Sequence, residues 1–317
     1  MHTPEFWREK NAVSTALLPA SYVYALGFFL RRACARPEKL PVPVICIGNL
    51  VAGGAGKTPL AFEVGEMVKA MGRRAFFLSR GYGGSLQGPV RVSPQHSAAA
   101  VGDEPLLLAR LLPTIVAKNR VAGAKAAIAE GAEVIIMDDG FQNPTLAKDF
   151  SLLAVDGAYR FGNGHLLPAG PLRQSVADGL KRADAVVTLY AALALPGDVP
   201  VFQGRLIAPA GWEGMRVFGF AGIAHPEKFK LTLKAMGCTL AGFTPFPDHH
   251  PYAETELEGL WKEAKASGAR LVTTEKDAVR LPPSWRERVL TVPVRLEIEG
   301  KEALRAMLRK AMGDAER

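Results

Sequence analysis

The segment Ala52-Gly53-Gly54-Ala55-Gly56-Lys57-Thr58 contains the residue types of a phosphate-binding loop. Small residues allow backbone N–H groups to converge on a phosphate chain, the Lys side chain neutralises the outer phosphates, and the Thr hydroxyl can hold Mg²⁺. An apolar, strand-like run (42–47) precedes the segment and a helical pattern (59–71) follows it, so a positive helix N-terminus lies at the same place. The usual first glycine is replaced by Val51, which makes the loop a variant. A glycine-rich turn without a nucleotide is the alternative, but the order of strand, loop, Lys-Thr and helix favours nucleotide binding.

A second apolar run (134–137) ends in two carboxylates, Asp138 and Asp139. In P-loop proteins a carboxylate at such a strand end holds Mg²⁺, directly or through water. An acidic strand end is common in any sheet. Combined with the upstream phosphate-binding loop, however, it predicts a metal site.

Asp103 and Glu104 stand directly before another helical stretch, and two interpretations are open. In the first, Asp103 caps the helix and Glu104 lies in its first turn. In the second, a carboxylate acts as general base beside an acceptor hydroxyl. The local sequence alone favours the cap.

Other polar residues lie on loops rich in Gly and Pro. His249 and His250 lack a third ligand that we can locate, so a zinc site is not expected. Their loop is either a solvated surface loop or the place of a histidine that orients a carboxylate base. Arg173 ends the long loop 160–173 and is either solvated or directed at phosphate charge. The segment 273–277 is typical of a capping box that opens a helix.

The elements that must position these residues alternate along the chain. Strand-like runs at 42–47, 75–78, 114–117, 134–137 and 152–155 alternate with helical stretches at 60–71, 104–112 and 121–130. This alternation predicts an α/β fold of the P-loop NTPase type, a doubly wound and mostly parallel sheet with ligands at the carboxyl ends of its strands.

The strand and helix pattern restarts after about residue 215. We therefore predict a nucleotide-binding domain over 37–214 and a smaller α/β domain over 215–317 that closes over the site. The Pro- and Gly-rich stretch 196–214 is the predicted hinge. Two substrates would meet in the cleft between the domains.

Composition limits the class of partner. The 317 residues are 48% apolar and 22% charged, as in a globular protein, and the formal net charge is +8. Such a charge suits a nucleotide, a nucleic acid or an anionic membrane surface. The three cysteines have no metal-ligand spacing and indicate reduced thiols in a cytoplasmic protein.

The N-terminal segment 1–36 contains an apolar run (16–30) that is too short to span a bilayer and that ends at Arg31 and Arg32. No clear signal-peptide cleavage site follows the run. Its large side chains can share one helical face, which is typical of a helix in a membrane interface. The alternative is an ordinary helix that packs on the protein's own surface.

Taken together, the motifs resemble the lipid A tetraacyldisaccharide 4'-kinase family. The resemblance covers nearly the whole chain in order, and the missing first glycine of the loop is usual in that family. The matching segments are Gly48-Asn49-Leu50 with the loop, Ser79-Arg80-Gly81-Tyr82-Gly83, Val101-Gly102-Asp103-Glu104-Pro105, Asp138-Asp139-Gly140-Phe141-Gln142, Arg160-Phe161-Gly162-Asn163-Gly164, Leu167-Pro168-Ala169-Gly170-Pro171-Leu172-Arg173, Asp248-His249 and Thr274-Glu275-Lys276-Asp277.

The resemblance implies a kinase that moves the γ-phosphate of ATP to the 4'-hydroxyl of an acylated glucosamine disaccharide 1-phosphate. It implies peripheral attachment to the cytoplasmic face of the bacterial inner membrane, an anionic surface. Asp103 would be the base, assisted by His249, with Lys57 and Arg173 on the transferred phosphate. Thr58, Asp138, Asp139 and Glu104 would lie in the Mg²⁺ region. Substrate-binding positions would be Asn49, Arg80, Tyr82, Arg120 and Asn163.

Two other classes of function compete with this expectation. A membrane-associated P-loop ATPase switch of the partitioning type shares such a loop but usually has a Lys where this chain has Ala52. A nucleic-acid-binding protein suits the net charge, but no interleaved aromatic and basic face supports it. We therefore expect no nucleic-acid partner, and nothing in the sequence implies an oligomer.

Overall fold

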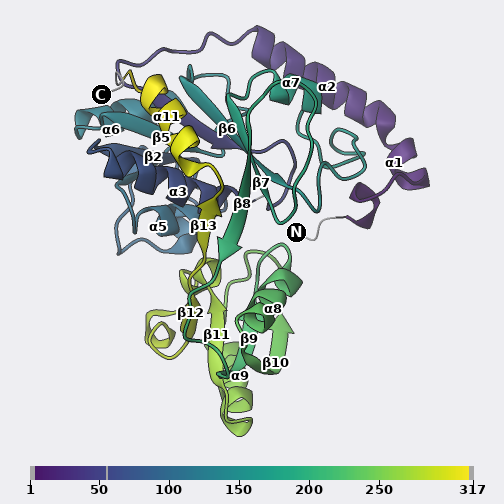
Figure 1. The fold of residues 1–317 in the computed structure, drawn as a ribbon, viewed down its shortest axis with the longest axis vertical. Helices are drawn as coiled ribbons and strands as arrows, with labels where there is room; N and C mark the ends of the chain where they lie inside the picture. The colour runs from purple at the N-terminus through teal and green to yellow at the C-terminus, as the bar shows by residue number, and fades with distance from the viewer. Residues whose placement is uncertain (1–3, 55, 314–317) are drawn as a thin grey trace.

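The computed structural model describes residues 4–54 and 56–313. Figure 1 shows two layered units, each built on its own sheet, with the smaller unit below the larger one.

The larger sheet has nine strands among the described residues. In spatial order they are β13 (Arg295–Ile298), β8 (Val201–Ile207), β7 (Ala185–Leu189), β6 (Phe150–Asp156), β1 (Val44–Gly48), β5 (Val134–Asp138), β2 (Ala75–Ser79), β4 (Thr114–Val116) and β3 (Val90–Arg91). The two edge pairs, β13 with β8 and β3 with β4, are antiparallel. The pairs between them are parallel, which confirms the predicted doubly wound, mostly parallel α/β sheet.

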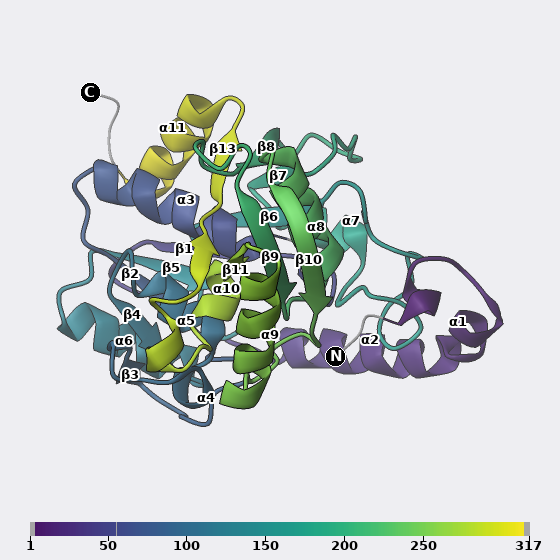
Figure 2. The same ribbon diagram turned by 90° about the horizontal axis from the view of Figure 1, so that it is seen from below.

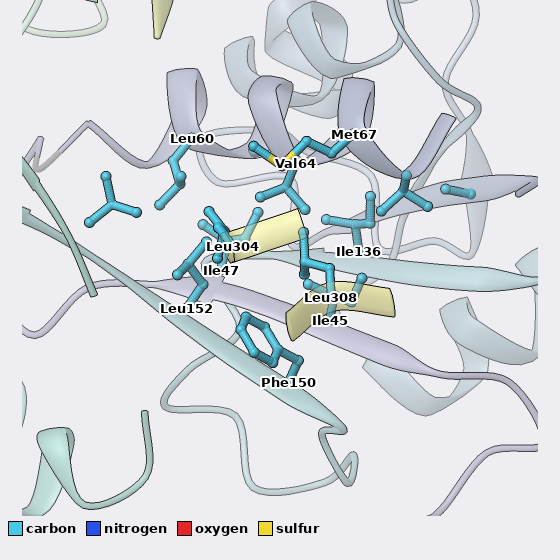
Figure 3. Close-up of a cluster of buried hydrophobic side chains, with 14 of the residues drawn as sticks. Ile45, Ile47, Leu60, Val64, Met67, Ile136, Phe150, Leu152, Leu304 and Leu308 are labelled. Carbon is cyan, nitrogen blue, oxygen red and sulfur yellow. The ribbon is translucent and has the colours of Figure 1, made fainter. Parts of the chain in front are cut away.

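The central strands are buried along their whole length and are mostly apolar, because both faces of the sheet are covered. Helices α3 (Lys57–Ala70) and α11 (Lys301–Ala311) cover one face. Figure 3 shows their side chains in one cluster with those of β1, β5 and β6. Helix α6 (Arg120–Ala129) covers the other face, where Ala124 and Ala127 let it approach the strands closely. The short helices of this unit are α4 (Ala98–Val101), α5 (Asp103–Leu108) and α7 (Val176–Leu180).

The smaller sheet is parallel throughout its described strands, in the order β10 (Thr239–Pro245), β9 (Arg216–Ala221), β11 (Arg270–Thr274) and β12 (Leu290–Val292). Its helices are α8 (Pro226–Ala235), α9 (Glu254–Ala266), α10 (Glu275–Ala278) and the 3₁₀ turn η2 (Pro283–Trp285). Phe220 and Leu257 lie in the core on one side of the sheet, and Leu233 and Val272 lie on the other. The predicted restart of the pattern near residue 215 is therefore confirmed.

The predicted boundary of the smaller domain is wrong at its C-terminal end. Strand β13 returns to the larger sheet and pairs with β8, and α11 buries Leu304 and Leu308 against that sheet. Residues 295–313 therefore belong to the larger unit. An amphipathic helix suits either unit, so its place depends on which sheet edge is free to accept β13.

The predicted hinge 196–214 is also wrong in its middle part. Residues 201–207 form β8, a strand of the larger sheet. Gly204 is a close-packing position there, because a Cβ atom would lie 3.0 Å from both Val187 and Leu296. The connections between the units are instead the segments 208–215 and 293–294.

The N-terminal segment contains the 3₁₀ turn η1 (Glu5–Trp7), α1 (Ala12–Ala16) and α2 (Leu18–Ala33). Both views of the ribbon place α2 along the outside of the larger unit. One face docks on the protein: the Ser21 hydroxyl donates to Leu166 O (2.9 Å) and accepts from Ala169 N (3.1 Å). On the outward side Tyr22, Val23 and Phe29 are 65–72% exposed. Within the described residues, no helix is long and apolar enough to cross a membrane.

Candidate active site

The phosphate-binding loop joins the carboxyl end of β1 to the first turn of α3, as predicted. Gly56 precedes α3 at φ +77°, a left-handed conformation that favours glycine, and a Cβ atom there would lie 2.4 Å from Leu189. Among the described residues, no side chain caps the N-terminus of α3. Its first N–H groups are therefore available to bind an anion. Gly53, Gly54, Gly56, Lys57 and Thr58 all line the adjoining cavity, whereas Ala55 lies outside the described residues.

The long loop 160–173 supports the phosphate-binding loop from the side. Ala52 N donates to Pro171 O at 2.7 Å, and Val51 forms an isolated bridge with Leu172. Arg173, the next residue, lies at the end of β5, where its Nη1 donates to both carboxylate oxygens of Asp139 at 2.9 and 3.1 Å. The same loop therefore shapes the nucleotide loop and places an arginine beside it.

Asp139 is held between two cations. Besides Arg173, Lys57 Nζ lies 3.7 Å from Asp139 Oδ1. Burial opposes ionisation of Asp139, but the charges of Lys57 and Arg173 outweigh it and lower the pKa of this carboxyl. The residue has φ +50°, an uncommon conformation for a non-glycine residue.

Asp138 has the opposite environment. It is buried, and its Oδ1 atom has no hydrogen-bond partner among the described residues. Burial, reinforced by the negative charge of Asp139, raises the pKa of Asp138 to about 7. A buried carboxylate oxygen without a protein partner fits a cation ligand.

Asp103 faces the smaller unit and does not cap its own helix, so that interpretation is wrong. The N-cap position of α5 is Gly102, at φ +91°, and Asp103 is the first helical residue. Its Oδ2 atom lies 2.8 Å from His249 Nδ1. The contact joins two residues that are 146 positions apart and that come from different units.

A second contact between the units runs parallel to the first. Lys276 Nζ lies 2.8 Å from Glu104 Oε1 and 3.4 Å from His249 Nε2. Burial opposes the charged form of Glu104, but Lys276 outweighs it and lowers the pKa of Glu104. Thr274 accepts a hydrogen bond from Asp277 N, which confirms the N-cap half of the predicted capping box. That pattern did not reveal the role of Lys276.

These residues meet at one large cavity of about 1200 Å³ between the two units. The cavity runs from the phosphate-binding loop to His249 and Lys276 and reaches Trp7 and Arg31 of the N-terminal segment. His249, rather than Asp103, lines it, and the Tyr82 ring lies 5.9 Å from the His249 ring. The cavity thus combines an anion-binding helix end, several cations, an orphan carboxylate and a carboxylate–histidine pair.

Comparison with known proteins agrees with this arrangement. A family model described as tetraacyldisaccharide-1-P 4'-kinase (LpxK) matches residues 13–313. The chain belongs to this family.

Relatives of full length support the assignment. The tetraacyldisaccharide 4'-kinase of Parvibaculum lavamentivorans is 49% identical over 342 residues and covers 100% of both chains. That of Rhodospirillum centenum is 48% identical and covers 97% of this chain and 96% of its own. The crystal structure of Aquifex aeolicus LpxK in complex with ATP superposes with a TM-score of 0.81 at 29% identity, covering 95% of this chain and 99% of that one. The prediction of a lipid A 4'-kinase is confirmed.

Three of the substrate-binding positions that the family resemblance implied line the cavity: Arg80, Tyr82 and Arg120. Arg120 is buried and donates to Ala117 O. Burial and the nearby charge of Arg80 lower the pKa of Arg120 to about 10. These positions suit an anionic or hydroxyl-rich ligand of the kinase family.

The other two positions do not line the cavity. Asn163 is buried, and its Nδ2 donates to Phe6 O (2.8 Å) and Ala169 O (2.9 Å). Asn49 is also buried, and its Nδ2 donates to Gly53 O at 3.3 Å. Both side chains brace loops in this structure, and their direct contact with substrate stays a prediction. Motif membership alone does not distinguish a bracing residue from a binding one.

His250 packs within the smaller unit. Its Nε2 lies 3.0 Å from Glu256 Oε2, and its ring stacks on Phe246 at 4.7 Å. Only the first histidine of the pair therefore reaches the cavity, and no group of three or more metal-ligating His, Cys, Asp and Glu side chains occurs among the described residues.

Proposed function

We propose that the Asp103–His249 pair removes the proton of the acceptor hydroxyl while the phosphate-binding loop holds ATP, so that the γ-phosphate passes to the 4'-hydroxyl of a tetraacyldisaccharide 1-phosphate. The observation that carries the proposal is the 2.8 Å contact between Asp103 and His249 at the wall of the cavity that the loop also lines. Phosphoryl transfer depends chiefly on position and on charge stabilisation, and this cavity supplies groups for both.

The prediction that Asp103 is the base takes a more specific form here. His249 lies at the cavity wall with its Nδ1 toward Asp103, so the proton leaves through the imidazole and Asp103 balances the resulting positive charge. Lys57 and Arg173, both lining the cavity, would neutralise charge on the transferred phosphate. Each of these groups is preorganised by the contacts described above.

Mg²⁺ fits the donor set at the end of β5. The Thr58 hydroxyl and the orphan Asp138 carboxylate would hold it, because Mg²⁺ takes one or two protein oxygens together with phosphate and water. When bound, it supplies neutralisation of phosphate charge. Asp139 and Glu104 remain predicted members of the metal region, but in this structure their carboxylates pair with Arg173 and Lys276.

The N-terminal helix is the proposed membrane contact. Tyr22, Val23, Leu26, Phe29 and Leu30 are 50–72% exposed on one side of α2, and Arg31 and Arg32 follow them. Large apolar side chains beside basic residues suit an interface with anionic lipid. Trp7 and Arg31 also line the cavity, so a lipid whose acyl chains stay in a bilayer would reach the site along this side. We propose that the enzyme lies peripherally on the cytoplasmic face of the inner membrane.

The reaction is tested by label transfer from γ-labelled ATP to tetraacyldisaccharide 1-phosphate in detergent micelles with Mg²⁺. We expect a labelled lipid bisphosphate. Release of labelled phosphate without any labelled lipid, at a rate independent of the acceptor, would instead indicate an ATPase switch.

The membrane contact is tested by the double substitution Leu26→Gln and Phe29→Gln. We expect binding to vesicles of anionic phospholipid to fall at least about 30-fold, because two exposed apolar side chains are lost from the interface, each contributing about 1–2 kcal/mol. The matched control is Val201→Gln, which alters an exposed apolar residue (42%) away from α2. Equal vesicle binding by the double variant, the control and the unaltered chain would rule out α2 as the contact.

A further inference from the structure

Arg280 is a buried arginine at the contact between the two units, and no sequence motif marked it. It follows α10 in the smaller unit, and its side chain is 4% exposed. All three of its nitrogens have partners: Nε donates to Lys276 O, Nη1 to His250 O (3.0 Å), and Nη2 to Gly222 O (2.9 Å). A guanidinium fixed at so many points has little freedom to move.

The same guanidinium is held by a buried carboxylate of its own unit. Arg280 Nη2 donates to Asp277 Oδ1 at 2.7 Å, and Asp277 is completely buried. That oxygen also accepts from Tyr252 OH (2.6 Å) and Gly222 N (2.8 Å). Asp277 therefore anchors Arg280 within the smaller unit whether or not the larger unit is in contact.

Toward the larger unit, Arg280 faces the catalytic pair. Its Nε lies 3.2 Å from Asp103 Oδ2, the oxygen that also contacts His249 Nδ1. Its bond to His250 O fixes the backbone next to His249, which itself has φ +61°. The Arg280 side chain thus contacts both the Asp103 carboxylate of the larger unit and the histidine loop of its own, smaller unit.

We propose that Arg280 is a positioning residue for proton removal: it fixes Asp103 against His249, and it does so only when the two units are docked. This inference rests on the proposed function of the Asp103–His249 pair. Arg280 carries no proton in the reaction and is not among the residues that line the cavity. Its effect on the reaction passes through Asp103.

Two charged side chains contact the Asp103 carboxylate directly, Arg280 and His249. Lys276 lies nearby, but it is paired with Glu104 on the same helix. Removing the Arg280 guanidinium therefore takes away one of the two direct contacts that hold Asp103 in place beside His249.

The test compares Arg280→Met and Arg280→Lys in the full chain by label transfer to the lipid acceptor. For Arg280→Met we expect kcat to fall about 10- to 100-fold and KM for ATP to change less than about threefold. Arg280→Lys keeps the charge but not the fork of donors. It should recover only part of kcat, again with KM for ATP changed less than about threefold.

Two further variants control for folding. Arg288→Met removes an arginine of the same unit that lies over Trp285, and it should leave kcat and KM for ATP unchanged. Arg280→Met combined with Asp277→Asn removes both members of the buried Arg280–Asp277 pair, so Asp277 is not left as an unpaired buried charge. We expect this double variant to show the same low kcat and the same KM for ATP as Arg280→Met.

Either of two results would overturn the inference. In the first, a folded Arg280→Met enzyme keeps the kcat of the unaltered chain. In the second, KM for ATP rises in step with the loss of kcat, as for a general structural defect. Failure of the proposed function looks different, because the unaltered chain would then transfer no label to the lipid.

Discussion

Replacing Asp103 with asparagine is expected to lower kcat for lipid phosphorylation by about 10²- to 10⁴-fold, the range for loss of general acid–base catalysis. The Asp103 carboxylate contacts His249 Nδ1 at 2.8 Å and the Arg280 guanidinium at 3.2 Å. A neutral amide no longer balances the charge of a protonated imidazole, and it does not fix the tautomer. Because Asp103 does not line the cavity, the nucleotide site should be untouched.

The measurement therefore separates two steps. Label transfer gives kcat, and equilibrium binding of ATP gives Kd, which should change less than about threefold. Asp178→Asn, an exposed carboxylate at the start of α7, is the control and should behave like the unaltered chain. A parallel loss of ATP affinity and transfer in Asp103→Asn would contradict the assignment of Asp103 to the proton-transfer step.

The second large effect is expected at Asp138, where activity and stability should change in opposite directions. Asp138→Asn removes the proposed Mg²⁺ carboxylate, so we expect transfer to fall at least about 10²-fold at any Mg²⁺ concentration. The same change should raise the free energy of unfolding at pH 8 by about 1–3 kcal/mol, because a buried charge is replaced by a neutral side chain of equal shape.

The stability gain should depend on pH in a defined direction. Burial and Asp139 raise the pKa of Asp138 to about 7 in the folded protein, above its unfolded value near 4. Between these values the folded state holds a proton that the unfolded state has lost, so stability falls as pH rises. The variant should therefore match the unaltered chain near pH 4, exceed it increasingly up to about pH 7, and keep a constant advantage above that.

Urea unfolding from pH 5 to pH 8.5 without Mg²⁺ checks the second prediction. Glu133→Gln, at the opposite end of the same strand and on the surface, should show no such pH-dependent gain. Stability of Asp138→Asn at or below that of the unaltered chain throughout this range would show that Asp138 does not bear a buried charge.

The local sequence pattern was sufficient to predict the strand and the helix that flank the phosphate-binding loop. An apolar run, small residues, Lys-Thr and a helix occur in the order that β1 and α3 require, and each signal lies within about 30 residues. The carboxylates at the end of β5 were found in the same way, because parallel strands bring their carboxyl ends to one edge. The family was also accessible from sequence, since its ordered motifs extend over most of the chain.

The sequence pattern did not predict the role of a residue whose partners lie far away in the chain. The local sequence favours Asp103 as a helix cap, whereas in the structure its carboxylate contacts His249 and Arg280 of the smaller unit. Asn49 and Asn163 belong to the family motifs, yet their amides brace loops. Gly204 suggested a hinge, but it packs between β7 and β13.

The sequence by itself determined the phosphate-binding loop, the parallel sheet around it and the kinase family. The loop and the family motifs are local segments, and the alternation of strands and helices recurs along the chain. Only the tertiary structure decided that Asp138 Oδ1 has no hydrogen-bond partner among the described residues and that Asp139 pairs with Arg173. It also decided that β13 and α11 return to the larger sheet. Burial and charge pairing are properties of neighbours in space. Asp138 and Asp139 are adjacent in the chain, yet their pKa values shift in opposite directions: burial raises that of Asp138, whereas pairing with Lys57 and Arg173 lowers that of Asp139.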